Sequence, residues 1–130
     1  MAKGGLSMKV YEVLRKLDSL RPNAFSDTEK LELLQTVEGR VYTDIFLRAA
    51  DFSGSPAPLS EETELSVPAP FHDLYLHYLM AMVAFYSGDT TGYTESMLLY
   101  NRCWEDFAAH YRANHKPVQK NLHGMRVRRG

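Results

Sequence analysis

The sequence predicts an all-α protein: a small helical bundle of about four helices, with a long loop rich in proline and glycine and an extended basic C-terminal arm. Three observations predict this class. Apolar residues recur with helical spacing in three segments, residues 71–87 are apolar on nearly every side, and 130 residues correspond to one domain with one ordinary core. We expect residues 8–117 to form the bundle, with the loop at 51–69 inserted, and residues 118–130 to form the arm.

The first helix is predicted over residues 6–20, and the chain before Met8 reads as a loose leader. Apolar residues in this helix are spaced by three and four, as in an amphipathic helix: Val10, Val13, Leu14, Leu17 and Leu20. Pro22 ends the pattern. The leader lacks the apolar stretch of a secretory signal peptide.

The second helix begins with a capping box, "SDTE", in which Ser26 and Glu29 each satisfy the backbone amide of the other. The apolar positions that follow keep one phase: Leu31, Leu34, Val37, Val41, Ile45 and Ala49. This predicts one long helix to about Ala50, with a weak point at Gly39 that costs up to ~1 kcal/mol. Two shorter helices split at Gly39 are the alternative.

Residues 51–69 have no helical period and are interrupted by glycine and proline, which predicts a loop. The segment "ETELSV" alternates weakly and is compatible with a short edge strand. Loops of this length are usually functional or disordered. We favour an interaction loop between subunits over a tolerated insertion. Its expected contact residues are Phe52, Leu59, Glu61, Glu62 and Glu64.

The third helix, over residues 71–87, is predicted to lie at the centre of the bundle. A membrane span needs about 20 apolar residues, whereas this run is shorter and contains His72, Asp73 and His77. Pro70 is expected at the first helical position, where no amide hydrogen bond is lost. Gly88 is expected to end the helix in a left-handed conformation.

The last helix has the strictest periodicity, a seam made of Tyr93, Met97, Tyr100, Trp104, Phe107 and Tyr111. This seam should pack on the central helix; the alternative is that part of it faces a neighbouring subunit. The helix should end before Pro117. The core residues predicted for the last two helices are Leu74, Tyr78, Met82, Phe85, Met97, Tyr100, Trp104 and Phe107.

The charges are segregated along the chain, although the formal net charge is only −1. Residues 51–106 hold nine acids and one base, whereas residues 107–130 hold six bases and no acid. The basic arm has three interpretations: a merely solubilising tail, a phosphate-binding segment, or a segment that reaches a protein surface of opposite sign. The predicted arm contacts are Lys116, Lys120, Leu122, Met125, Arg126, Val127, Arg128 and Arg129.

Catalytic and metal-binding patterns are not evident. His72 and His77 are five residues apart, as are His110 and His115, whereas metal ligands on one helical face are three or four apart. Cys103 is the only cysteine, which excludes an internal disulfide, and it reads as a small core residue. We therefore expect a protein that is not an enzyme and needs no cofactor or metal.

Three segments together resemble a family of small helical proteins of tailed bacteriophages and prophages, the head–tail connector or adaptor proteins. These segments are "LDSLRPNAFSDTEKLELLQTVEGRVYTDIF", "TELSVPAPFHDLYLHYLMAMVAFYSGD" and "YNRCWEDFAAHYRANHKP". The most specific matches are residues 67–79, which combine prolines with aromatic residues, and residues 111–117, which run from Tyr111 to the terminal "NHKP". The resemblance covers residues 10–117 and leaves 118–130 without a matching motif.

The resemblance implies a virion protein of the neck, assembled in the host cytoplasm, that forms a ring of about a dozen copies. The implied partners are the portal protein above and a stopper or tail-completion protein below. DNA would pass through the lumen without sequence-specific binding, and no membrane would be involved. Two other functions remain open from the residues: a DNA-binding packaging accessory that uses the basic arm, and a generic helical interaction module.

Overall fold

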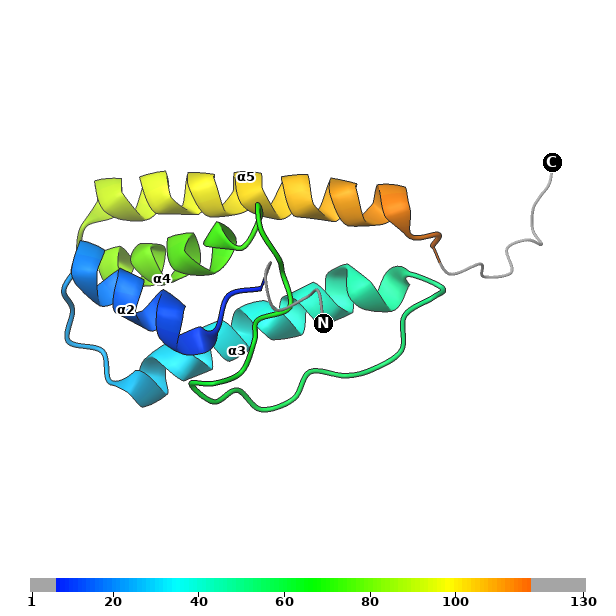
Figure 1. Cartoon of the computed structure of the whole chain (residues 1–130). Coiled ribbons are helices and arrows are strands. Elements are labelled where there is room, and N and C mark those ends of the chain that lie inside the picture. The colour runs from blue at the N-terminus through cyan, green and yellow to red at the C-terminus, as the bar shows by residue number, and fades with distance from the viewer. Residues whose placement is uncertain (1–6, 118–130) are drawn as a thin grey trace.

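The computed structural model describes residues 7–117, which form four α-helices and no named strand (Figure 1). The helices are α2 (Val10–Leu20), α3 (Asp27–Asp44), α4 (Asp73–Tyr86) and α5 (Thr90–Asn114). A short 3₁₀-helix, η1 (Phe46–Arg48), follows α3. The predicted all-α class is thereby confirmed for this part of the chain. The predicted arm at 118–130 lies outside the described residues.

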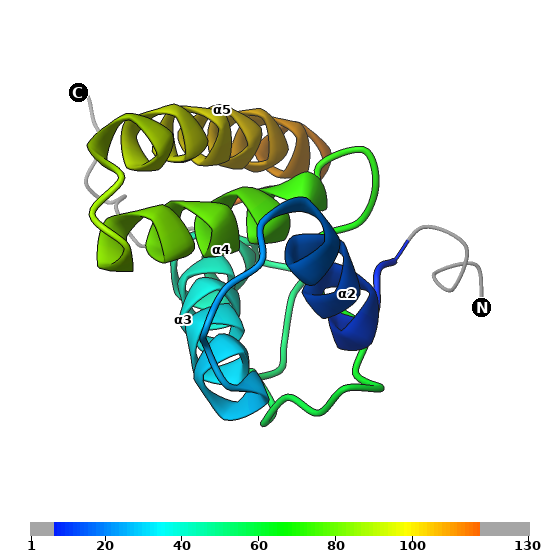
Figure 2. The same cartoon turned by 90° about the vertical axis from the view of Figure 1, so that its left-hand side faces the viewer.

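Helix α4 lies at the centre of a three-layered arrangement (Figure 2). It packs against α5 on one side and against both α2 and α3 on the other. This position explains its composition, because a helix covered on several sides has no need of a polar face. Its buried residues point in all directions around the helix: Leu74, Tyr75, Leu76, Leu79, Ala81, Val83 and Ala84.

Helix α2 begins at Val10 rather than at residue 6, which corrects the predicted start, whereas its end at Leu20 and the signals inside α2 and α3 are largely confirmed. Val10, Val13, Leu14 and Leu17 are buried, whereas Leu20, at the end of α2, is exposed. The Ser26 hydroxyl accepts from the Glu29 amide at 3.1 Å, and the Glu29 carboxylate accepts from the Ser26 amide at 2.8 Å. Helix α3 continues through Gly39 without a break.

Helix α3 ends at Asp44 rather than near Ala50, which corrects the predicted boundary. The chain tightens into η1 and thereby turns the Phe46 side chain into a cluster of aromatic rings. Phe46 lies 5.2 Å from Tyr42, 5.0 Å from Phe52 and 4.9 Å from Tyr111 between ring centroids. Such contacts come from distant segments, so the helical period alone does not reveal them.

The two ends of α4 give one correction and one confirmation. The helix begins at Asp73, so Pro70 lies before it, after a cis Ala69–Pro70 bond, and does not occupy the first helical position. Gly88 has φ +80°, the left-handed conformation expected of it. The Asp89 amide then donates to the Ala84 carbonyl at 2.8 Å, and the Gly88 amide to that of Phe85 at 3.2 Å.

The loop at 51–69 is held on the bundle at several points. Its "ETELSV" segment makes an isolated bridge between Glu64 and Lys9 rather than a strand. Leu65 and Val67 are fully buried. Gln35, on α3, donates to the Ala57 carbonyl at 3.2 Å and accepts from the Leu59 amide at 3.0 Å. The loop is therefore part of the packed structure over most of its second half.

Most of the predicted core residues of α4 and α5 lie in or against the core. Leu74, Tyr100 and Phe107 are buried, and Tyr78, Met97 and Trp104 pack against them while partly exposed. Met82 is partly exposed and lies outside this cluster. Phe85 is 57 % exposed, contrary to the prediction. It lies in the last turn of α4, at the end of the bundle, where its ring contacts Tyr86 and Tyr93.

Glu38 is a buried charged residue whose hydrogen bonds are satisfied inside the bundle. Its carboxylate accepts from the Tyr75 hydroxyl at 2.6 Å, and from the Ser66 hydroxyl and amide at 2.8 and 3.0 Å. The Val67 amide donates to the Tyr75 hydroxyl at 2.9 Å. Burial and the Glu38 charge hold the pKa of Tyr75 well above its ordinary value, so the phenol remains a donor. We call Glu38, Ser66 and Tyr75 the buried polar node.

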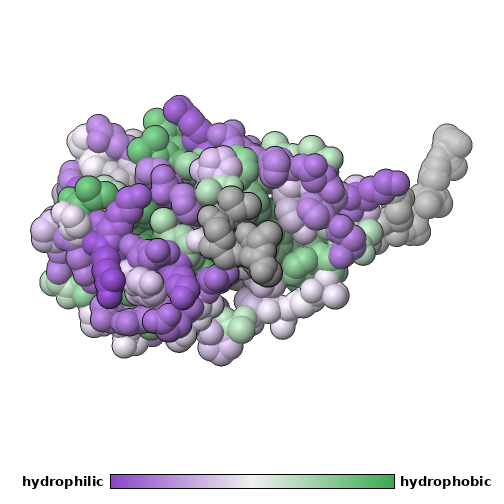
Figure 3. Space-filling model, viewed as in Figure 1, coloured by the Kyte–Doolittle hydropathy of each residue, from purple (hydrophilic) through white to green (hydrophobic). Residues whose placement is uncertain are grey.

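The surface is mostly polar, with apolar patches near α5 and at the end where α4 meets it (Figure 3). Side chains with large exposed apolar area are Leu20, Leu47, Phe85, Tyr86, Leu98 and Leu99. Among residues 7–117, no helix combines the length and the hydropathy needed to cross a bilayer.

Candidate functional site

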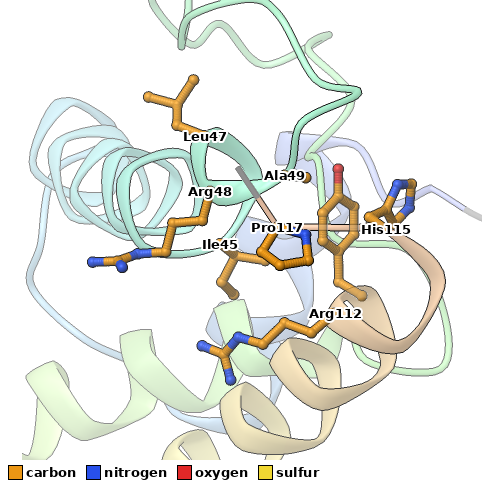
Figure 4. Close-up of a pocket in the computed structure, with 8 residues that line it drawn as sticks. Ile45, Leu47, Arg48, Ala49, Arg112, His115 and Pro117 are labelled. Carbon is orange, nitrogen blue, oxygen red and sulfur yellow. The ribbon is translucent and has the colours of Figure 1, made fainter. Parts of the chain in front are cut away.

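The most distinct hollow of the described chain is a cleft of about 500 Å³ between the end of α3 and the end of α5. Arg48, Arg112 and His115 supply its cationic and polar groups, and we call it the basic cleft. Its apolar walls come from Ile45, Leu47, Ala49, Tyr111 and Pro117. In Figure 4 the Arg48 and Arg112 side chains extend in the same direction from two different elements, with the Ile45 side chain between them.

The aromatic cluster around Phe46 positions the cleft. Because η1 places Phe46 against Phe107 and Tyr111 of α5, the residues after it are fixed beside the last turns of that helix. Arg48 thus lines the same cleft as Arg112, although 63 residues separate them in the sequence. The contacts within this cluster are made by aromatic rings, so they hold η1 against the last turns of α5 without using either arginine.

The floor of the cleft is closed by contacts between the residues that follow η1 and those that follow α5. The Ala50 amide donates to the Lys116 carbonyl at 2.8 Å, within a bridge that pairs Ala49 with Pro117. His115 Nδ1 lies 2.8 Å from Asp51 Oδ2. An ionised carboxylate can only accept, so the imidazole donates in this bond. The His115 ring also stacks on Tyr111, with 3.8 Å between centroids.

The charge of the cleft is not neutralised within the described chain. Among residues 7–117, neither Arg48 nor Arg112 forms an ion pair, and the nearby Asp51 is paired with His115. Arg112 also lies in the last turn of α5, where a cation is favoured by the helix dipole. Two exposed guanidinium groups beside apolar walls are suited to bind a carboxylate or phosphate that carries an apolar neighbour.

An oppositely charged surface lies beside the start of α2. Glu61, Glu62 and Glu64 are exposed there, and we call them the acidic edge. The backbone beneath them is fixed, because the Glu61 and Thr63 carbonyls accept from the Tyr11 and Val10 amides at 3.0 and 2.9 Å. Among residues 7–117, Glu62 is the one member of the acidic edge with an ion-pair partner, Lys9, at 3.4 Å.

The structure describes all of the residues predicted for the loop contacts but only one of those predicted for the arm, Lys116. Lys116 is exposed and lies in the sequence between His115 and Pro117, which line the basic cleft. The other predicted arm residues lie outside the described range: Lys120, Leu122, Met125, Arg126, Val127, Arg128 and Arg129. In the loop, Phe52 and Leu59 turn inward and pack against the core. The three glutamates remain exposed.

Arg48 is not among the residues predicted from the sequence, and Arg112 is predicted only as one of the bases of the C-terminal stretch. A usable signal was present for Arg48, which interrupts the apolar phase between Ile45 and Ala49. Its pairing with Arg112 had no such signal, because the two residues meet only after the bundle forms.

A second hollow, of about 360 Å³, lies at the opposite end of the bundle. It is lined by the turn after α2 and the end of α4, including Phe25, Val83 and Tyr86. Tyr86 is 68 % exposed, and its ring contacts Phe25 edge-on at 5.8 Å. This hollow therefore has an exposed aromatic ring at its side, whereas the basic cleft has two exposed guanidinium groups.

The groups that bear metal or nucleophilic chemistry are dispersed in this part of the chain. Residues 7–117 contain no group of three or more His, Cys, Asp or Glu side chains able to hold a metal ion. Burial raises the pKa of the Cys103 thiol, which disfavours the reactive thiolate. Burial also lowers the pKa of His77.

Comparison with models of known protein families, with curated proteins and with solved structures finds no match to this chain. The assignment of a function therefore starts from the charged surfaces, the exposed apolar side chains and the resemblance in the sequence.

Proposed function

We propose that this protein is a virion assembly protein, a head–tail connector that forms a ring beneath the portal of a tailed bacteriophage. The observation that carries the proposal is the pair of rigid surfaces of opposite charge, the basic cleft and the acidic edge. Neither is neutralised by the described chain, apart from the single Lys9–Glu62 pair. Charged groups left unpaired on fixed backbone are suited to steer and orient other chains.

The exposed apolar residues support an assembly role as well. Phe85 and Tyr86 at the end of α4, and Leu98 and Leu99 on α5, are large side chains that fold into no core. Large exposed apolar side chains that form a patch typically mark a contact with another protein. In the proposed assembly the neighbours are other copies of the chain, the portal protein, and the stopper or tail-completion protein.

The distribution of basic residues near the C-terminus also supports the proposal. Pro117 lies at the basic cleft, and four more bases follow it in the sequence: Lys120, Arg126, Arg128 and Arg129. A connector of this kind contacts the portal through its C-terminal segment. We therefore assign portal binding to residues 118–130, ring contacts to the bundle, and the neck of the virion to the assembled ring.

Co-sedimentation of the full-length protein with purified portal rings tests this function. The wild type should sediment with the portal, and the variant Arg126→Gln/Arg128→Gln/Arg129→Gln should lose most of this binding. The matched control removes three positive charges from exposed positions of the bundle, as Arg15→Gln/Lys16→Gln/Arg102→Gln, and should bind as the wild type does. A wild type that stays in the supernatant would contradict the proposal.

A DNA-binding packaging accessory is the second candidate, and one observation favours it. Arg48 and Arg112, the second of which belongs to the basic C-terminal stretch, bring two exposed guanidinium groups to one cleft, and such groups bind phosphates. This function requires affinity for duplex DNA that falls steeply with salt. If the wild type binds DNA in this way and ignores the portal, the accessory function replaces the connector.

A further inference from the structure

The basic cleft has a shape and charge that fit acidic side chains presented by a peptide backbone. Its two guanidinium groups offer planar, bidentate donors for carboxylates, and the surrounding walls are apolar. A bare phosphate ion would use the arginines but leave the walls at Leu47 and Pro117 without a contact. A segment that presents glutamates would use both, because the methylene groups of these side chains can lie on the apolar walls while the carboxylates reach the arginines.

The acidic edge has the complementary properties. Three exposed carboxylates fall within four residues, 61–64, on a backbone that α2 holds by two hydrogen bonds. A turn closed by Ser60 and Thr63 holds the segment from within, since the Thr63 amide donates to the Ser60 carbonyl at 3.1 Å. Because this segment is already ordered, binding through it loses little conformational entropy.

One residue of the acidic edge, Glu62, forms an ion pair within the same chain, but this ion pair is weak. Lys9 and Glu62 are 3.4 Å apart, and both side chains are exposed. Exposed ion pairs contribute little because water screens both charges. Glu61 and Glu64 make no ion pair with any residue that the structure describes.

The two surfaces occupy different places on the bundle and share no residue. The acidic edge lies beside the start of α2, whereas the basic cleft lies at the ends of α3 and α5 (Figure 1). One copy can therefore use both surfaces at the same time. A contact that joins two different patches repeats from copy to copy and closes into a ring when the rotation allows it.

We propose that the acidic edge of one copy docks in the basic cleft of the next, so that Glu61, Glu62 and Glu64 meet Arg48 and Arg112 of the neighbour. This inference rests on the proposed function, because it names the contact between subunits of the ring. It makes each binding site incomplete without the neighbouring copy.

Complementation between two neutralised variants tests the contact. The cleft variant is Arg48→Gln/Arg112→Gln, and the edge variant is Glu61→Gln/Glu62→Gln/Glu64→Gln. In analytical ultracentrifugation of the full-length protein at low salt, the wild type should form species larger than dimers. Each variant alone should associate about 100-fold more weakly, because charge-assisted hydrogen bonds are lost. An equimolar mixture should form dimers and nothing larger, since only one intact edge can meet one intact cleft.

A charge-swapped chain provides the second arm. The protein with Arg48→Glu/Arg112→Glu and Glu61→Arg/Glu62→Arg/Glu64→Arg together should associate with itself again, while either reversal alone should not. The matched controls, Arg15→Gln/Arg102→Gln and Glu95→Gln/Glu105→Gln/Asp106→Asn, change exposed charges elsewhere and should associate as the wild type does. Circular dichroism establishes that each variant is folded.

Two results overturn the inference: a wild type that stays monomeric both alone and on the portal, or cleft and edge variants that assemble like the wild type. Failure of the proposed function is seen separately, in the portal co-sedimentation. If the wild type binds the portal but the cleft and edge variants assemble as the wild type does, only the inferred contact between subunits is contradicted. If the variants complement each other but the wild type does not bind the portal, only the proposed connector function is contradicted.

Discussion

The buried polar node and the basic cleft both use charged residues from the segment that runs through α3 and η1, yet their surroundings are opposite. Glu38 is 4 % exposed and accepts three hydrogen bonds from Ser66 and Tyr75. Arg48 is exposed and has no ion pair within the described chain. One charge is satisfied by the fold, and the other is available to a partner.

This difference separates polar residues that build the fold from those that can act outside it. A buried carboxylate is tolerated only when its hydrogen bonds are complete, so it stabilises one arrangement of the loop on α3 and α4. An exposed guanidinium is hydrated in the monomer and costs the fold almost nothing. Stability and association should therefore respond to different substitutions.

The largest effect is expected from removal of the carboxylate of the node. Glu38→Ala should lower the free energy of unfolding by about 3 kcal/mol, because it leaves the Tyr75 hydroxyl and the Ser66 amide without their acceptor. Urea denaturation measures this change. Glu32→Ala, on the exposed side of the same helix, is the matched control and should change stability by less than about 0.5 kcal/mol. If Glu38→Ala is as stable as this control, the buried polar node does not stabilise the fold.

A smaller, pH-dependent effect is expected from Tyr100, whose hydroxyl accepts a hydrogen bond from Arg40 at 3.0 Å. Burial raises its pKa from 10.0 to about 12. A group whose pKa is raised by folding, such as the Tyr100 phenol, favours the folded state while it is protonated. Its contribution to the free energy of unfolding is complete below pH 10.0 and is lost as the pH rises through about 12. The loss amounts to about 2–3 kcal/mol.

Urea denaturation between pH 9 and pH 12 measures this loss as the difference between the wild type and Tyr100→Phe. The wild type should lose more stability with rising pH, because phenylalanine has no proton to release. Tyr86→Phe removes an exposed hydroxyl and serves as the control. Parallel curves for the wild type and Tyr100→Phe would show that the Tyr100 hydroxyl is solvated in the folded protein.

Much of the bundle was predictable because its signals are local. The three-and-four spacing of α2, the capping box at Ser26 and Glu29, and the left-handed Gly88 each depend on neighbouring residues. The end of α3 was not predictable in this way, because Phe46 turns toward rings from the loop and α5. Phe85 was misplaced for a similar reason: its burial depends on what covers the last turn of α4, not on its spacing.

The two charged sites differ in what the sequence could reveal. Glu38 falls four residues after Leu34 and three before Val41, so a carboxylate on the apolar side of a helix was a signal for a buried polar group. Its partners Ser66 and Tyr75 lie 28 and 37 residues further on, and only the fold brings them together. The basic cleft depends in the same way on the closure of α3 and α5 around Phe46.

The smallest effect on stability is expected at the basic cleft, and it tests directly whether the two arginines contribute to the fold. Arg48→Gln/Arg112→Gln should change the free energy of unfolding by less than about 0.5 kcal/mol, because both side chains are hydrated in the monomer. Urea denaturation of dilute, monomeric protein measures it beside Glu38→Ala. A loss near that of Glu38→Ala would mean that the arginines serve the fold. An unchanged midpoint would show that the fold does not depend on either arginine, which leaves both free to bind the carboxylates of residues 61–64 of a second copy, as proposed above.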